Sequence, residues 1–128
     1  RGRRCSQLKY YWNAVKENPE TQFVLGHSGA LQFESALELS KEHSNVWLEI
    51  SCQGLPNIRR IIKEAPIDRV MFGSDWPFYH QALPLAKLLI ATEESKAVRR
   101  KILSENACKL FQLTLDREAS IPSLKSTA

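Results

Sequence analysis

The sequence predicts an α/β domain in which short parallel strands alternate with helices, and three observations support this fold class. Short apolar runs each end in a polar or glycine-containing turn, and a segment with helical periodicity follows. The strand-ending residues His27, Ser51 and Asp75 lie 24 positions apart, a spacing that suits one strand plus one helix. Nearly continuous apolar strands between amphipathic helices are typical of a parallel sheet that helices cover.

A helix is predicted before the first strand. Residues 6–18 form it, with an apolar stripe made of Leu8, Tyr11, Trp12 and Val15. Pro19 ends this helix, because the residue before a proline avoids the helical conformation. Residues 22–26 are predicted to follow as a short strand, and residues 30–43 as a helix with one apolar face.

The alternation of strand and helix then repeats. Residues 46–50 are rich in β-forming side chains, and residues 56–65 form an amphipathic helix. The third strand is predicted at residues 69–72. Two further helices complete the pattern, at residues 82–91 and 94–113.

We expect one domain, residues 1–115, because the chain contains no internal linker. Residues 116–128 have few apolar side chains and no periodicity, which predicts a mobile tail. A sheet of three parallel strands has two open edges, and apolar open edges invite pairing with further strands. We therefore expect self-association, or pairing with a segment that supplies more strands.

The composition argues against a disordered or membrane-spanning protein. Hydrophobic residues make up 43% and charged residues 25%, as in a globular domain. No apolar run approaches the roughly 20 residues of a membrane helix, and no apolar stretch follows the arginine-rich start as in a secretory signal. We expect no membrane partner. The three cysteines are widely spaced without a C-x-x-C pair, which favours a reducing, cytoplasmic compartment over a disulfide framework.

The net charge of +4 is concentrated at the start of the chain. Arg1, Arg3 and Arg4 supply three of these charges, and most other basic side chains are interleaved with glutamates. Nucleic-acid binding needs a clustered basic face that neutralises several phosphates together. We expect no nucleic-acid partner.

Polar side chains follow each predicted strand: His27 after the first, Ser51 and Cys52 after the second, and Asp75 after the third. Because the carboxyl ends of neighbouring parallel strands meet at one rim, we expect these side chains to lie close together. A histidine and an aspartate that converge there can ligate a divalent metal. They can also activate a water molecule, with the carboxylate as base and the imidazole as donor to developing charge.

Each of these residues also has a purely structural interpretation. His27 and Asp75 suit helix caps or turns, and Ser51 suits a capping hydroxyl because no G-x-S-x-G elbow surrounds it. Cys52 is interpreted first as a small packing residue. Trp76 follows Asp75 in the loop, where it could line a substrate pocket or simply pack. The spacing alone leaves these alternatives open.

Four segments carry a family resemblance. They are FVLGHSGA (23–30), SNVWLEIS (44–51), DRVMFGSDWPF (68–78) and KILSENACKLF (101–111). Together, and in this order, they resemble the closing motifs of the amidohydrolase-related metal-dependent hydrolases, a TIM-barrel group that includes lactonases and decarboxylases. The resemblance covers about residues 22–113.

The resemblance implies that this chain is the C-terminal part of a TIM (β/α)8 barrel and that its strands correspond to about strands six to eight. It also implies that Asp75 is the strand-eight aspartate, which binds the metal and helps to deprotonate the attacking water. His27 matches the strand-six histidine, which contacts substrate or metal near the reacting carbon. We add Trp76 and Ser51 as candidate substrate-binding residues at the same rim.

The sequence departs from the family pattern in one respect. The family's first strand carries an H-x-H pair of metal ligands, and this chain has only His27, His43 and His80. A catalytic zinc site normally has three protein ligands. The resemblance implies a divalent metal, zinc first, at Asp75, and the other ligands of the site are absent from this chain.

These observations predict the C-terminal part of a metal-dependent hydrolase of this superfamily. We expect it to act on a small carboxylated or lactone-like substrate and to be inactive alone. The alternative is a non-catalytic, truncated or degenerate fragment that serves as an interaction or assembly domain.

Overall fold

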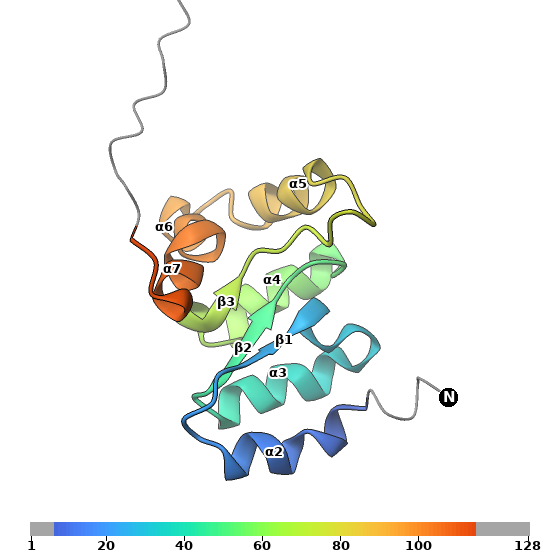
Figure 1. Ribbon diagram of the computed structural model, residues 1–128. Coiled ribbons are helices and arrows are strands. Elements are labelled where there is room, and N and C mark those ends of the chain that lie inside the picture. The colour runs from blue at the N-terminus through green and yellow to red at the C-terminus, as the bar shows by residue number, and fades with distance from the viewer. Residues whose placement is uncertain (1–6, 115–128) are drawn as a thin grey trace, which may run out of the picture.

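The computed structural model describes residues 7–114, which form a three-stranded parallel sheet with surrounding helices (Figure 1). The strands are β1 (Phe23–Leu25), β2 (Val46–Glu49) and β3 (Val70–Met71), and β2 lies between the other two. Both strand pairs are parallel. The predicted α/β fold class is confirmed, and each observed strand lies inside a predicted one.

The helices follow the predicted order. They are α2 (Trp12–Glu17), α3 (Phe33–Glu42), α4 (Leu55–Glu64), α5 (Ala82–Ala91), α6 (Lys96–Arg100) and α7 (Asn106–Phe111). Short 3-10 segments are η1 (Leu8–Tyr10), η2 (Gly26–Gln32) and η3 (Ile67–Arg69), and η4 (Lys101–Glu105) is a π-helix. The predicted tail at residues 116–128 lies outside the described residues.

Two predicted helices differ from the observed elements. The first is divided into η1 and α2, with Tyr11 between them. The last is interrupted by η4, where the carbonyl of Ile102 accepts from the backbone N–H of Phe72 at 2.8 Å. The N–H of Asn106 bonds instead to the carbonyl of Lys101, five positions earlier. A contact with the end of β3 thus replaces a regular helical hydrogen bond, which explains the π-helix.

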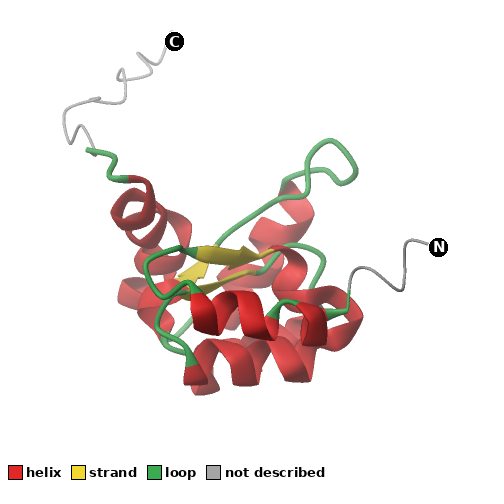
Figure 2. Cartoon of the chain, turned by 60° about the horizontal axis from the view of Figure 1, so that its bottom comes forward, coloured by secondary structure: helices red, strands yellow, loops and turns green. Residues whose placement is uncertain are grey.

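The core lies between the sheet and the helices that cover one of its faces, as Figure 2 shows. Leu48 of the central strand is 1% exposed and belongs to the same buried cluster as Leu37 of α3 and Ile61 of α4. Its neighbours Trp47 and Glu49 alternate with it along β2, so their side chains point to the other face of the sheet. No helix between residues 7 and 114 has both the length and the hydrophobicity that a membrane span requires.

Asn106 joins the last helix to the start of β3. Its side-chain amide is buried and donates to the carbonyls of Ile67 and Val70, each at 2.7 Å. The predicted apolar face of this helix includes Asn106, and the two hydrogen bonds explain why an amide is placed there.

Asn106→Ala should lower the free energy of unfolding by about 2–4 kcal/mol, because two partly or fully buried carbonyls lose their donor. Urea denaturation followed by circular dichroism measures this loss. Asn13→Ala, at an exposed position of α2, is the control and should change stability by less than about 0.5 kcal/mol. Equal effects of the two variants would contradict the role of Asn106.

Candidate metal and catalytic site

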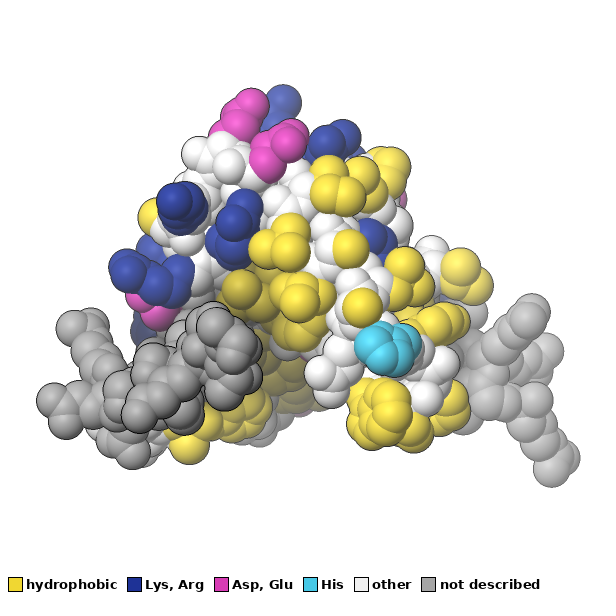
Figure 3. Space-filling view, turned by 90° about the horizontal axis from the view of Figure 1, so that it is seen from above, with side chains coloured by type: hydrophobic (Ala, Val, Ile, Leu, Met, Phe, Trp, Pro, Cys, Tyr) yellow, Lys and Arg dark blue, Asp and Glu magenta, His cyan; other side chains and the backbone are white. Residues whose placement is uncertain are grey.

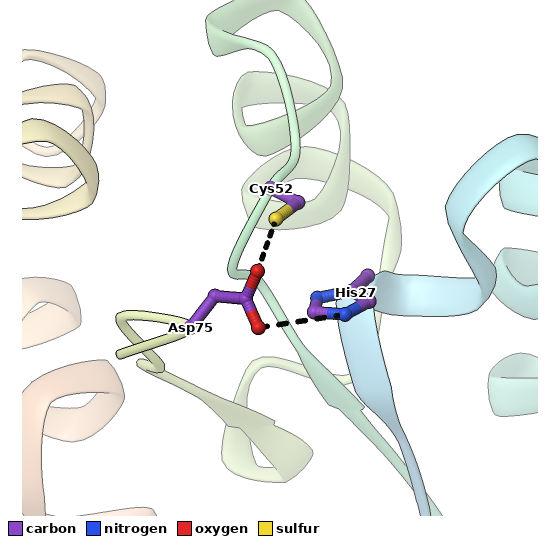
Figure 4. Close-up of side chains that lie close together, drawn as sticks. All are labelled: His27, Cys52 and Asp75. Atoms are coloured by element: carbon purple, nitrogen blue, oxygen red, sulfur yellow. Dashed lines mark hydrogen bonds and ion pairs between the residues drawn. The ribbon is translucent and has the colours of Figure 1, made fainter. Parts of the chain in front are cut away.

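Three side chains converge at the carboxyl ends of the strands (Figure 4). Nε2 of His27 lies 3.8 Å from Oδ1 of Asp75, and the Sγ–H of Cys52 donates to Oδ2 of the same carboxylate at 3.1 Å. One potential ligand atom from each residue lies within 4.8 Å of the other two. The prediction that His27 and Asp75 meet at a common rim is confirmed.

The backbone is left-handed at all three positions. The φ angles are 53° at His27, 59° at Cys52 and 58° at Asp75. Positive φ is uncommon for residues other than glycine, and a residue held there costs about 1–3 kcal/mol. Unfavourable backbone conformations at the ends of three successive strands are typical of a functional site, where the required direction of the side chains imposes the backbone strain.

A hydrogen-bond chain supports His27 from the side away from Asp75. Nδ1 of His27 lies 2.7 Å from Oγ of Ser51, and this hydroxyl donates to Oε2 of Glu49 at 2.6 Å. The side-chain amide of Gln53 donates to the carbonyl of His27 at 2.5 Å. Ser51 is 1% exposed, so its hydroxyl serves these internal partners, and its predicted contact with substrate stays a prediction.

Cys52 has an unusually weak acid group. Loss of hydration, together with the hydrogen bond and the negative charge of Asp75, raises the pKa of the Cys52 thiol to about 11. The thiol is therefore protonated at neutral pH, as its hydrogen bond to Asp75 requires. A metal ion that binds this sulfur must displace the proton.

A small pocket of about 150 Å³ adjoins the cluster, lined by Cys52, Ser74, Tyr79, Leu83, Pro84 and Lys87. Trp76 is 65% exposed and does not belong to this lining. Its predicted role in substrate binding stays a prediction. The face of the molecule in Figure 3 shows exposed hydrophobic side chains gathered over its hollowed part.

Sequence reasoning did not anticipate the roles of two residues. Cys52 was expected at the rim and was interpreted first as a packing residue, but it is exposed and contacts Asp75. Glu49 was assigned no role, yet its carboxylate lies at the centre of the contacts around Ser51. The available signal was a lone acidic residue inside an apolar strand, since a partly buried carboxylate needs specific partners.

The comparison with known families identifies the class of protein. The sequence model of the family described as Amidohydrolase matches residues 4–113. The chain belongs to the amidohydrolase family.

Individual relatives agree with this assignment. The chain is 26% identical to a 2-pyrone-4,6-dicarboxylate hydrolase of Comamonas testosteroni, over 62% of this chain and 34% of that protein. It resembles a zinc-bound amidohydrolase structure from Burkholderia multivorans with a TM-score of 0.64 and 20% identity, over 84% of this chain and 50% of that one.

A third relative is a decarboxylase. The 5-carboxyvanillate decarboxylase of Sphingomonas paucimobilis matches with a TM-score of 0.63 and 19% identity, over 79% of this chain and 36% of that one. These structural neighbours have the TIM-barrel fold, and the chain spans between about a third and a half of the length of the relatives named here.

Asp75→Asn should lower the pKa of Cys52 from about 11 towards the ordinary range for cysteine, because the carboxylate charge disappears. A lower pKa means more thiolate at a given pH. Allowing for the weaker nucleophilicity of a more acidic thiol, alkylation by iodoacetamide at about pH 8.5 should accelerate about three- to tenfold. A Cys5→Ser, Cys108→Ser background leaves Cys52 as the single thiol.

The matched control is Asp68→Asn in the same background, because Asp68 is an aspartate that pairs with Lys101 away from the site. Alkylation should then keep its original rate and pH midpoint. A midpoint for Cys52 that does not move in Asp75→Asn would contradict the contact between these two side chains.

Proposed function

We propose that this chain supplies the C-terminal part of a metal-dependent hydrolase of the amidohydrolase family, with β1, β2 and β3 as about strands six to eight of the barrel. The observation that carries the proposal is the convergence of His27, Cys52 and Asp75 at one rim of a parallel sheet. In TIM-barrel enzymes the active site lies at this rim. The convergence of three potential ligands argues against a non-catalytic assembly domain.

The donors fit a divalent ion such as zinc. They comprise one imidazole nitrogen, one thiol sulfur and one carboxylate oxygen, which are the ligand types that zinc accepts. Tetrahedral zinc with ordinary bond lengths places neighbouring ligand atoms about 3.3–3.6 Å apart. In the structure, Nε2 of His27 lies 3.8 Å from Oδ1 of Asp75 and Sγ of Cys52 lies 3.1 Å from Oδ2 of the same carboxylate. One ligand atom from each residue lies within 4.8 Å of the other two, so the three groups must move slightly together to hold an ion.

Each residue has a distinct proposed role. Asp75 holds the metal and accepts the proton of the attacking water, and His27 acts at the reacting centre beside it. A divalent ion bound here would lower the pKa of its water to about 7. Cys52 is proposed as an additional ligand. Trp76 and Ser51 remain our candidates for substrate contacts.

A small carboxylated or lactone-like compound is the proposed substrate. Lys87 lines the pocket beside Cys52, and its ammonium group suits a substrate carboxylate. The names of two relatives, a pyrone dicarboxylate hydrolase and a carboxyvanillate decarboxylase, describe ligands of this kind.

The open edge of β1 is the proposed place for further strands. A groove of about 710 Å³ runs along this edge, and Val24 and Leu31 beside it are 42% and 100% exposed. An apolar strand edge is stabilised when another strand covers it. We propose that other strands of the barrel, or a second chain, occupy this edge.

The EDTA-treated chain should bind Co²⁺ with a sulfur-to-cobalt charge-transfer band, because Cys52 contributes a thiolate. Cys52→Ser should abolish the band, and Asp75→Asn should weaken binding about tenfold or more, since a ligand or its charge is lost. Cys108→Ser, in α7, is the control and should keep the band. Binding by Cys52→Ser with the original spectrum would contradict the proposed donor set.

Asp75→Asn should lower kcat at least about 100-fold in the zinc-loaded enzyme that contains this chain, because the proton acceptor is lost. Hydrolysis of lactones and pyrone dicarboxylates measures kcat, and thermal melting checks the fold. Asp68→Asn should retain turnover. Turnover close to the original value in Asp75→Asn would remove this carboxylate from catalysis.

A further inference from the structure

Glu49 is a partly buried carboxylate that neutral donors surround. Its side chain is 19% exposed. It accepts from the backbone N–H of His27 at 3.0 Å, from the backbone N–H of Ser51 at 2.5 Å and from the hydroxyl of Ser51 at 2.6 Å. Gly73 leaves room for it, because a Cβ at this position would overlap Oε1 of Glu49. The fold therefore builds a fitted place for this side chain.

With Glu49 ionised and His27 neutral, the chain of contacts favours one arrangement of the protons. A carboxylate only accepts hydrogen bonds, so the hydroxyl of Ser51 must donate its single proton to Glu49. The hydroxyl is then an acceptor towards His27, and Nδ1 of His27 must carry the proton in their 2.7 Å contact. In a neutral imidazole, Nε2 is left with a free lone pair.

The competing arrangement is the Nε2–H tautomer, whose proton has no acceptor within hydrogen-bond distance among residues 7–114. In the other neutral tautomer a proton on Nε2 faces Oδ1 of Asp75, but these atoms are 3.8 Å apart, beyond hydrogen-bond range. The contact of Nδ1 with Ser51 lies well within that range. That contact fits donation in either direction, and the proton that Ser51 gives to Glu49 at 2.6 Å decides that Nδ1 of His27 is the donor.

We propose that Glu49 is a positioning residue that acts through Ser51 to hold neutral His27 as its Nδ1–H tautomer, with the lone pair of Nε2 directed towards Asp75. Its catalytic meaning rests on the proposed function. In this tautomer, neutral His27 takes up a proton or offers its lone pair to an ion, and it cannot donate from Nε2 to a substrate oxygen. This differs from the donor role that the sequence suggested for the imidazole.

The test is the nitrogen NMR spectrum of the imidazole rings in the full chain. The sample is uniformly 15N-labelled, EDTA-treated protein at about pH 8, where a histidine with an ordinary pKa is neutral. Long-range proton–nitrogen correlations then distinguish the two neutral tautomers. The chain has three histidines, and the signals that disappear in His27→Ala belong to His27. We expect at least a tenfold excess of the Nδ1–H form, about the worth of one well-formed charge-assisted hydrogen bond.

Two variants test the hydrogen-bond relay, by which we mean the contacts from Glu49 through Ser51 to Nδ1 of His27, and a third variant controls for an indirect structural effect. Ser51→Ala removes the acceptor of the Nδ1 proton, and Glu49→Ala frees the hydroxyl of Ser51 to donate to Nδ1. Either change should reduce the excess of the Nδ1–H form to about one or invert it. Ser104→Ala is the matched control, because its hydroxyl bonds only to the carbonyl of Arg100 in its own helix. It should leave the His27 spectrum unchanged.

Each outcome decides the proposal. An Nε2–H form in the unmodified chain, or an unchanged Nδ1–H excess in Ser51→Ala, would overturn it. If Glu49→Ala does not fold, Ser51→Ala still tests the relay, because it removes a single hydroxyl. The spectrum needs neither metal nor turnover. A correct tautomer without metal binding by the chain, or without turnover by the enzyme that contains it, would therefore refute the proposed function and leave the role of Glu49 intact.

Discussion

The parallel register of β1, β2 and β3 is the constraint on which the candidate site depends. The pairing of Leu25 with Leu48, and of Glu49 with Met71, brings the three strand ends level. A shift of one residue in either pair would turn every side chain of that strand to the opposite face. His27 and Asp75 would then lie on different sides of the sheet. The apolar core behind the sheet fixes the register and thereby assembles the site.

The electrostatics of the rim follow from this assembly. The imidazole ring of His27 lies between two carboxylates. Its Nδ1 is 3.8 Å from Oε2 of Glu49, and its Nε2 is 3.8 Å from Oδ1 of Asp75. Between residues 7 and 114, neither carboxylate forms an ion pair with a lysine or an arginine, and both are satisfied by neutral donors or the imidazole. The charge of Asp75 disfavours the thiolate of Cys52 and outweighs the opposing charge of Lys87, which lines the same pocket as Cys52.

The sequence predicts those features that depend on local patterns. The alternation of elements follows from hydrophobic periodicity, and the helix at residues 82–91 has the predicted bounds. Contacts between distant residues are not encoded in periodicity. The π-helix depends on the hydrogen bond from the N–H of Phe72 to the carbonyl of Ile102. The exposure of Cys52 depends on a left-handed backbone conformation at Cys52 itself, which a residue other than glycine does not predict. Glu49 acquires its partners only when β1 and β2 pair.

The relatives include both a hydrolase and a decarboxylase, so features common to the fold cannot by themselves select the reaction. The choice must depend on groups that vary around the shared rim. In this chain the residues immediately after Asp75 are exposed, whereas Ser51 is buried and hydrogen-bonded. In the proposed relay, the buried hydroxyl of Ser51 sets the state of His27, whereas the exposed loop after Asp75 has fewer internal constraints on its side chains.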